Sequence, residues 1–338
     1  DLGRALASGQ GFSETLGDNP IPHTKYPFGF PLMLAIVETF FPFNITALKG
    51  LIILLYAISV PLTYKFIQQD ASPFRNVHST LALPVTSLCL ISPPLLNFSH
   101  QIMSEIPFLT FSLMALILLE RANSLQKKTT FVWAILVTMT AFYIRTTGIV
   151  LILTGIGFFT VNKKYTLAAI MAVSSILIAV PWFIRNAALG EAVYLNQILN
   201  VNPYNPEAGF LTISTFVERI LSNLNIYGLT EIPRIFFPSL VTTHSFILGI
   251  GVSSFLIHSL ISGFRRRELP AIYLILYLSL YLCWPQVWSD IRFLLPAIPI
   301  FFYVVLKNVS NFITWLNLKI SILPPKLVFV LIFIFPLS

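Results

Sequence analysis

The residues of this chain that are best suited to chemistry are three arginines that each lie between two apolar segments: Arg145, Arg185 and Arg292. A guanidinium group keeps its charge and presents its N–H donors in a planar fork that fits the oxygens of a phosphate or a carboxylate. Each arginine also has a simpler explanation. Arg145 could reach the headgroup region of a bilayer, and Arg185 could follow an interfacial anchor formed by Trp182. Arg292 could pair with Asp290.

A carboxylate at the start of an apolar segment could act as an acid or a base. Glu105 follows Ser104 and precedes Pro107, which is also the pattern of a helix N-terminus. Charge beside a membrane is costly unless it is paired or faces water, so Glu105 is a functional candidate as well. The two roles are compatible. Further candidate acids or bases in the first part of the chain are Asp1, Glu14 and Asp18.

The sequence contains no recognisable metal centre or phosphate loop. Its five histidines are scattered, and no two have the spacing of metal ligands. We therefore expect no cofactor, although the sequence leaves a divalent ion open. Cys89 and Cys283 fall inside apolar segments, so a disulfide framework is not expected. The glycines of Gly9-Gln10-Gly11 lack the lysine and the preceding strand of a phosphate loop.

The elements that must position these residues are membrane helices. Hydrophobic residues make up 56% of the chain and charged residues 10%, with a mean hydropathy of +0.82, which excludes a soluble globular domain. The apolar runs are continuous and lack the alternation of barrel strands, and a spanning helix needs about 20 residues. We therefore predict an all-α polytopic membrane protein with about ten transmembrane helices, at 47–68, 79–96, 105–120, 130–144, 146–161, 165–184, 239–263, 269–285, 292–306 and 322–337.

Basic residues mark alternate connections between these segments. Lys and Arg resist translocation, so such connections are expected on the cytoplasmic side of the membrane. The opposite, outer side then holds Glu105 and the three arginines of the first paragraph. We interpret the net charge of +8 as a topology signal and expect no nucleic-acid partner. The basic residues assigned to the inner side are Lys65, Arg75, Arg121, Lys127, Lys128, Lys163, Lys164, Arg265, Arg266, Arg267, Lys307, Lys319 and Lys326.

Two long outer segments interrupt the series of spans. Residues 1–46 form the first, in which 32–43 is apolar but too short to cross and is expected to be an interfacial or re-entrant helix. Residues 185–238 form the second. Its later part, from Thr212 to Tyr227, has apolar residues at helical spacing and is expected to lie on the membrane as an amphipathic helix. No internal repeat is evident, so we predict one membrane domain over 1–338.

The order of these motifs resembles that of the GT-C membrane glycosyltransferases, a class that includes the protein O-mannosyltransferases and the lipid A aminoarabinose transferases. The resemblance extends from residue 1 to about residue 306, and the order and common sidedness of the motifs make it specific. It rests on the N-terminal segment from Leu2 to Phe12, the run Tyr26-Pro27-Phe28-Gly29-Phe30-Pro31, Ser104-Glu105, Arg145-Thr146-Thr147-Gly148, Pro181-Trp182 with Arg185-Asn186, and Arg292-Phe293-Leu294-Leu295-Pro296.

The resemblance implies a GT-C-like helical bundle that transfers a sugar from a polyprenyl-phosphate donor to a lipid, glycan or protein acceptor. It implies a multi-pass protein of the bacterial inner membrane whose active face is periplasmic. The principal catalytic Asp of the family aligns upstream of Asp1, so we expect a further span before residue 1. The implied roles are catalysis for Asp1 and Glu105, binding of the donor phosphate for Lys25, Arg145, Arg185 and Arg292, and a substrate loop for His23, Tyr26 and Asn186.

Two other classes of function remain open. A flippase or transporter of lipid-linked sugars would carry ionisable groups near the middle of its spans and often an inverted repeat, whereas the charges here gather at the ends of the spans. A non-catalytic protein that binds lipid-linked sugars would need only the binding residues. The sequence does not name the sugar, the acceptor, the length of the prenyl chain or the oligomeric state.

Overall fold

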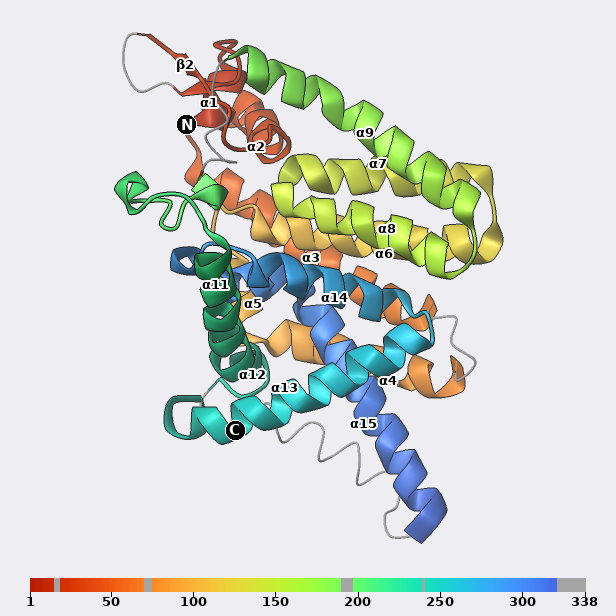
Figure 1. Cartoon of the computed structure of the whole chain (residues 1–338). Helices are drawn as coiled ribbons and strands as arrows, with labels where there is room; N and C mark the ends of the chain where they lie inside the picture. Colours follow the sequence, from red (N-terminus) through yellow and green to blue (C-terminus); the bar gives the residue numbers. More distant parts are fainter. Residues whose placement is uncertain (15–18, 70–74, 190–196, 239–240, 321–338) are drawn as a thin grey trace. The chain divides into compact units, whose positions relative to one another are not determined.

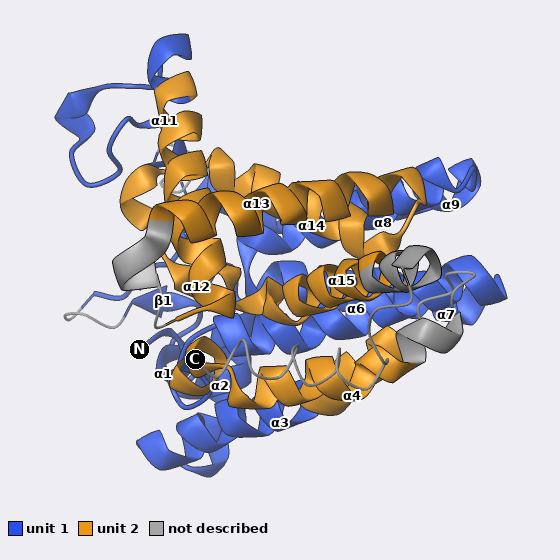
Figure 2. Ribbon diagram, turned by 90° about the horizontal axis from the view of Figure 1, so that it is seen from below, with its two compact units in different colours: residues 1–59, 98–216 blue, residues 60–97, 217–338 orange. Residues whose placement is uncertain are grey.

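The computed structural model describes residues 1–14, 19–69, 75–189, 197–238 and 241–320, and these residues are mainly helical (Figure 1). The chain divides into two compact units (Figure 2). Unit 1 comprises 1–59 and 98–216, and unit 2 comprises 60–97 and 217–338. The long helix α3 (Ile45–Gln69) contributes to both units. The single domain expected from the sequence stays a prediction.

Unit 1 combines a small N-terminal layer with four long helices. The N-terminal layer contains α1 (Leu2–Ala7), the strands β1 (Ser13–Glu14) and β2 (Ile21–Pro22), and α2 (Gly29–Phe40). The strands pair antiparallel, with Ser13 opposite Pro22. This hairpin has only two residues in each strand, and the described residues are otherwise mainly helical, so the predicted all-α fold class is confirmed. The long helices are α6 (Glu105–Leu125), α7 (Lys128–Ile144), α8 (Ile149–Val161) and α9 (Tyr165–Ala188).

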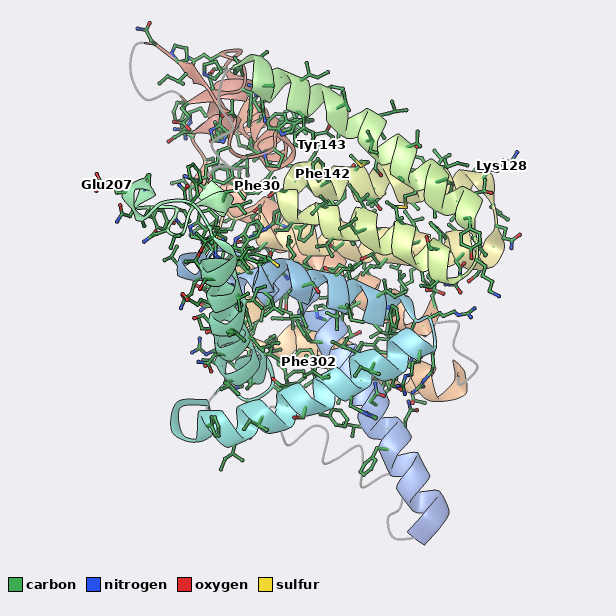
Figure 3. All side chains as sticks on the ribbon, viewed as in Figure 1. Phe30, Lys128, Phe142, Tyr143, Glu207 and Phe302 are labelled. Carbon is green, nitrogen blue, oxygen red and sulfur yellow. The ribbon has the colours of Figure 1, made fainter. Side chains whose placement is uncertain are left out.

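Close backbone contacts fix the N-terminal layer to the end of α7. A Cβ atom on Gly29 would lie 2.5 Å from the carbonyl oxygen of Tyr143, so only glycine lets α2 begin there. The ring of Phe28 packs on that of Tyr143, with 4.6 Å between the centroids. Figure 3 shows Tyr143 and Lys128 at opposite ends of α7. The polar N-terminal segment therefore packs at the end of unit 1 opposite the basic connection at Lys127 and Lys128.

Unit 2 is built around tyrosines of α14 (Leu269–Leu282). Tyr273, Tyr277 and Tyr281 follow one another at intervals of four residues, share one face of the helix and are fully buried. The Tyr277 hydroxyl donates to the carbonyl oxygen of Phe293. The other elements are α4 (Arg75–Ile91), α5 (Pro93–Phe98), α11 (Ile213–Ile226), the π-helix η3 (Tyr227–Glu231), α12 (Ile232–Phe236), α13 (Val241–Arg265), the 3-10 helices η4 (Gln286–Trp288) and η5 (Ile291–Ala297), and α15 (Ile298–Ile320).

Five described helices are long and apolar enough to cross a membrane: Ile45–Gln69, Glu105–Leu125, Tyr165–Ala188, Phe246–Arg265 and Ile291–Phe312. Shorter apolar helices cover Gly29–Phe40, Thr80–Ile91, Lys128–Ile144, Thr146–Val161 and Leu269–Leu282. The chain is thus a helical protein with the composition of a membrane protein, and the expected count of ten spans is not confirmed. The predicted span 322–337 lies outside the described residues.

Among the predicted boundaries that were wrong, two involve prolines. The span expected at 79–96 is broken, because α4 ends at Ile91 and α5 begins at Pro93, where Pro93 and Pro94 each remove a backbone donor. The span expected to end near residue 184 instead continues to Ala188 with Pro181 inside it. Arg185 and Asn186 therefore belong to a helix, although the sequence placed them at the start of an outer loop.

Candidate functional site

Arg185 is the centre of the polar contacts in the N-terminal part of unit 1. Its Nη1 donates to the carbonyl oxygen of His23 at 2.9 Å, and its Nη2 donates to that of Phe12 at 3.3 Å. Nη1 also donates to Oδ1 of Asn186 at 2.9 Å. The guanidinium lies over the rings of Phe12 and Trp182, 5.4 and 5.2 Å from their centroids. Its partners are neutral groups, so the positive charge is held in place without being cancelled.

An open groove lies beside Arg185. It has a volume of about 430 Å³ and a mainly apolar lining, in which Arg185 is the charged side chain among the described residues. Because Arg185 lies in the last turns of a membrane-length helix, the groove is at the end of an apolar span. The described residues that line it are Gln10, Gly11, Phe12, Ser13, Pro20, Pro22, Arg185, Ala188 and Leu189. The arrangement offers one fixed cation and apolar surface to an anionic, partly apolar ligand.

His23 and Asn186, which were predicted to belong to a substrate loop, hold the segment around His23 and Thr24 against α9. Asn186 donates from Nδ2 to the carbonyl oxygen of Thr24 at 3.2 Å. The buried His23 has Nδ1 2.8 Å from Oε1 of Glu14, and its Nε2 accepts the N–H of Tyr26 at 2.9 Å. This pattern fits a neutral imidazole with its proton on Nδ1. Nε2 is therefore already occupied and is not a free base.

Glu105 and Arg145, predicted as acid or base and as phosphate ligand, form an ion pair with each other. Nη1 of Arg145 lies 2.7 Å from Oε1 of Glu105, and the two side chains are 12% and 5% exposed. Arg145 also donates to Oγ of Ser104 at 3.3 Å. Ser104 occupies the N-cap position of α6, but its side chain makes no capping bond. The pair joins the start of α6 to the end of α7, a contact that the sequence analysis did not predict.

The remaining predicted residues of unit 1 lie at its surface. Asp1 is exposed at the N-terminus of α1 and does not line the groove. Lys25 lies over the ring of Tyr26, with Nζ 5.3 Å from the centroid, and Tyr26 is half exposed. Lys25 thus places a cation beside the Tyr26 ring. Its predicted role in phosphate binding and that of Asp1 in catalysis stay predictions.

Sequence reasoning missed a second charged pair in this N-terminal layer. Arg4 of α1 lies 3.3 Å from Glu38 of α2, and the Glu38 carboxylate also accepts the N–H of Phe43 at 2.8 Å. Arg4 lies over the Phe43 ring, 4.3 Å from its centroid. The available signal was an acidic residue inside the apolar run 32–43. The pair ties α1 to α2, and both helices flank the loop that forms the groove.

Arg292, the third arginine, belongs to unit 2. It lies at the start of η5, where the carboxylate of Asp290 caps the helix by accepting the backbone N–H of Arg292 at 3.0 Å. Its guanidinium lies over the ring of Phe293, 4.7 Å from the centroid. Asp290 thus contacts the main chain of Arg292, as a helix cap. The predicted convergence of Arg292 with the arginines of unit 1 stays a prediction.

A polar cluster of unit 2 was also missed. Asn223 is fully buried and donates from Nδ2 to the carbonyl oxygens of Tyr281, Leu282 and Trp284, at 3.3, 3.0 and 2.7 Å. Its Oδ1 accepts the Ser289 hydroxyl at 2.7 Å. The polar face of α11 is therefore directed into the protein. Apolar periodicity alone does not show this, because in a soluble protein the apolar face of a helix would be the buried one.

A buried carboxylate lies in the π-helix η3, which directly follows α11 in the chain. Glu231 is 7% exposed, and burial raises its pKa above the usual range of a carboxyl group. Arg234, with Nη1 3.1 Å from Oε2, opposes this shift, and the charge of Asp290 adds to it. This carboxylate is a structural group of the π-helix that titrates at higher pH than an exposed one.

Among the described residues, no group of three His, Cys, Asp or Glu side chains could hold a metal ion. Comparison with known proteins gave no match: no family model, no curated protein and no solved structure is significantly similar to this chain. The geometry of the site is therefore the evidence on which a function must be argued.

Proposed function

We propose that this chain is a GT-C-like membrane glycosyltransferase that takes its sugar from a polyprenyl-phosphate donor at the periplasmic face. The observation that carries the proposal is the groove beside Arg185, because it sets a fixed guanidinium at the end of a membrane-length helix. A lipid-linked phosphate has its tail in the bilayer and its charge at the surface. The tail of such a lipid fits beside the apolar span, and its phosphate fits the guanidinium of Arg185.

The chemistry of such a transfer requires a cation and a base. As the bond between sugar and phosphate breaks, negative charge grows on the departing phosphate oxygens, and a positioned guanidinium stabilises that charge. In this proposal Arg185 has that role. Its bonds to Phe12 and His23 hold it in place before the donor binds.

The base must take a proton from the acceptor hydroxyl. Glu14 is the carboxylate next to the groove-lining residue Ser13, is half exposed, and is hydrogen-bonded to His23. We assign the base to Glu14 within this proposal, because Glu105 is held by Arg145. Acceptors are lipids, glycans or proteins with a free hydroxyl.

The test uses the protein in lipid with a panel of radiolabelled polyprenyl-phosphate sugars and a mixture of lipid, glycan and protein acceptors that carry free hydroxyls, and measures the release of polyprenyl phosphate. Arg185→Gln should lower the rate by about 100-fold, the cost of removing one preorganised electrostatic contact. Arg185→Lys keeps the charge and should recover part of the rate. Arg121→Gln removes a charge at the far end of α6 and is the matched control.

Four outcomes decide between the alternatives. Turnover that is lost in Arg185→Gln and in Glu14→Gln, with the control active, supports the transferase. Donor binding that depends on Arg185 without turnover identifies a binding protein, which one observation favours: the described residues lining the groove include no carboxylate. Movement of intact donor across the bilayer identifies a flippase. A folded protein that binds no donor refutes the proposal.

A further inference from the structure

The turn between α13 and α14 carries three consecutive exposed arginines, Arg265, Arg266 and Arg267. α13 ends at Arg265, and Figure 1 shows the short connection from there to α14. Three main-chain hydrogen bonds close the turn, with N–O distances of 2.9 to 3.2 Å. The three guanidinium groups are therefore carried by an ordered backbone at the end of a membrane-length helix.

The only carboxylate of this turn is neutralised from inside the protein. Glu268 pairs with Lys307 of α15, whose Nζ lies 3.0 Å from Oε1 and whose side chain is 2% exposed. Arg266 is 3.9 Å from the same carboxylate and also donates to the hydroxyl of Ser262. Within the described part of the chain, Arg265 and Arg267 have no ion-pair partner. The turn therefore keeps an uncompensated positive charge.

An apolar stripe on α13 leads up to these arginines. Ile257, Ile261 and Phe264 are spaced by four and three residues, so they share one face, and they are 54%, 48% and 48% exposed. Leu256 and Leu260 on the other side of the helix are buried. The exposed face of α13 thus combines apolar side chains with cations at its C-terminal end. This arrangement is complementary to the acyl chain and the headgroup of an anionic phospholipid.

We propose that this face binds an anionic phospholipid of the inner leaflet, with an acyl chain along Ile257, Ile261 and Phe264 and the headgroup phosphate on Arg265 and Arg267. Arginine forks fit phosphate oxygens, and basic residues beside a membrane attract anionic lipids. The buried Lys307 contributes by removing Glu268 as a competitor for the arginines. Positive charge alone would be enough to set the topology of the chain. It would require neither the exposed apolar stripe nor the pairing of Glu268 with Lys307. The site is independent of the proposed transferase activity.

The experiment measures lipid retention on the full chain. The protein is reconstituted with equal amounts of phosphatidylglycerol and phosphatidylcholine, partly delipidated, and analysed by native mass spectrometry for bound lipid. The wild type should retain phosphatidylglycerol in preference. The double variant Arg265→Gln/Arg267→Gln should lower that preference by about 30-fold, which corresponds to about 1 kcal/mol for each basic residue near an anionic lipid.

Two further variants make the result decisive. Arg267 has a φ of 60°, a conformation that favours glycine, so Arg267→Gly removes the charge without straining the backbone and should give part of the loss. Lys127→Gln/Lys128→Gln removes two exposed charges from another basic connection and should leave the preference unchanged. Equal losses in both double variants would show only a general surface potential. That result, or a wild type without preference, overturns the proposal.

Discussion

Removing the negative charge of Glu105 should destabilise the fold strongly. The ion pair with Arg145 is short, at 2.7 Å, and its two side chains are 5% and 12% exposed. At an effective dielectric constant of about 20, two unit charges at this distance attract by about 6 kcal/mol. Their desolvation offsets much of that, so the intact pair contributes little in total. A lone buried arginine, however, keeps its desolvation cost without the attraction.

Glu105→Gln and Arg145→Gln should therefore each lower the free energy of unfolding by about 3–5 kcal/mol. The double variant should cost no more than either single one, because it removes both charges, which gives a coupling energy of at least about 3 kcal/mol. Ser104→Ala removes only the 3.3 Å hydrogen bond to Arg145 and should cost about 1 kcal/mol.

The assay is unfolding in mixed micelles titrated with a denaturing detergent, followed by circular dichroism for the four proteins and the wild type. Additive losses in the double variant would show that the two charges do not stabilise each other. A Glu105→Gln protein as stable as the wild type, but without transferase activity, would refute the structural interpretation. It would return Glu105 to the catalytic role that the sequence suggested.

Three further predictions test unit 2. Asn223→Ala should lower the free energy of unfolding by about 2–4 kcal/mol, since it leaves buried main-chain carbonyls without their donor, as unfolding titrations would show. Glu231 has a raised pKa, so the native state binds its proton more tightly than the unfolded state. Stability should therefore fall as the pH rises from about 4.3 through the raised value, and Glu231→Gln should abolish this part of the pH dependence. A fluorophore on Leu224→Cys should be quenched by a lipid-soluble quencher more than one on Ser222→Cys, which lies on the opposite side of the helix, if the exposed apolar face of α11 lies on the membrane.

Much of the helical architecture could be predicted from the sequence, because long apolar runs between charges have few alternatives. The span predicted at 47–68 is the helix Ile45–Gln69, and the amphipathic segment from Thr212 to Tyr227 contains the helix Ile213–Ile226. Boundaries at proline were less predictable. Pro181 was expected to end a helix that in fact continues to Ala188, whereas Pro93 and Pro94 divide a segment that was expected to be continuous.

The partners of the charged side chains could not be predicted, because they depend on distances across the fold. Arg145 and Glu105 are 40 positions apart in the chain, and their types alone suit catalysis and ion pairing equally. Arg185 reaches the carbonyl oxygens of Phe12 and His23 over an even longer separation. Every residue has a main-chain carbonyl oxygen, so the residue type does not show which carbonyl oxygen accepts a hydrogen bond. The candidates could thus be named, but their roles had to come from geometry.

Arg145 and Arg185, the two arginines of unit 1 that were predicted to bind phosphate, differ in their partners, and this difference decides which is the better phosphate ligand. Both lie at the ends of apolar helices, and both were predicted to bind the donor phosphate. Arg145 is bound to a carboxylate, so an incoming phosphate would have to compete with Glu105 for it. Arg185 is held by neutral groups, so its field is directed at the groove without a competing anion in its described hydrogen bonds. Positioning by carbonyl oxygens and aromatic rings fixes a cation and leaves its charge available, which is the property that binding of a lipid phosphate requires.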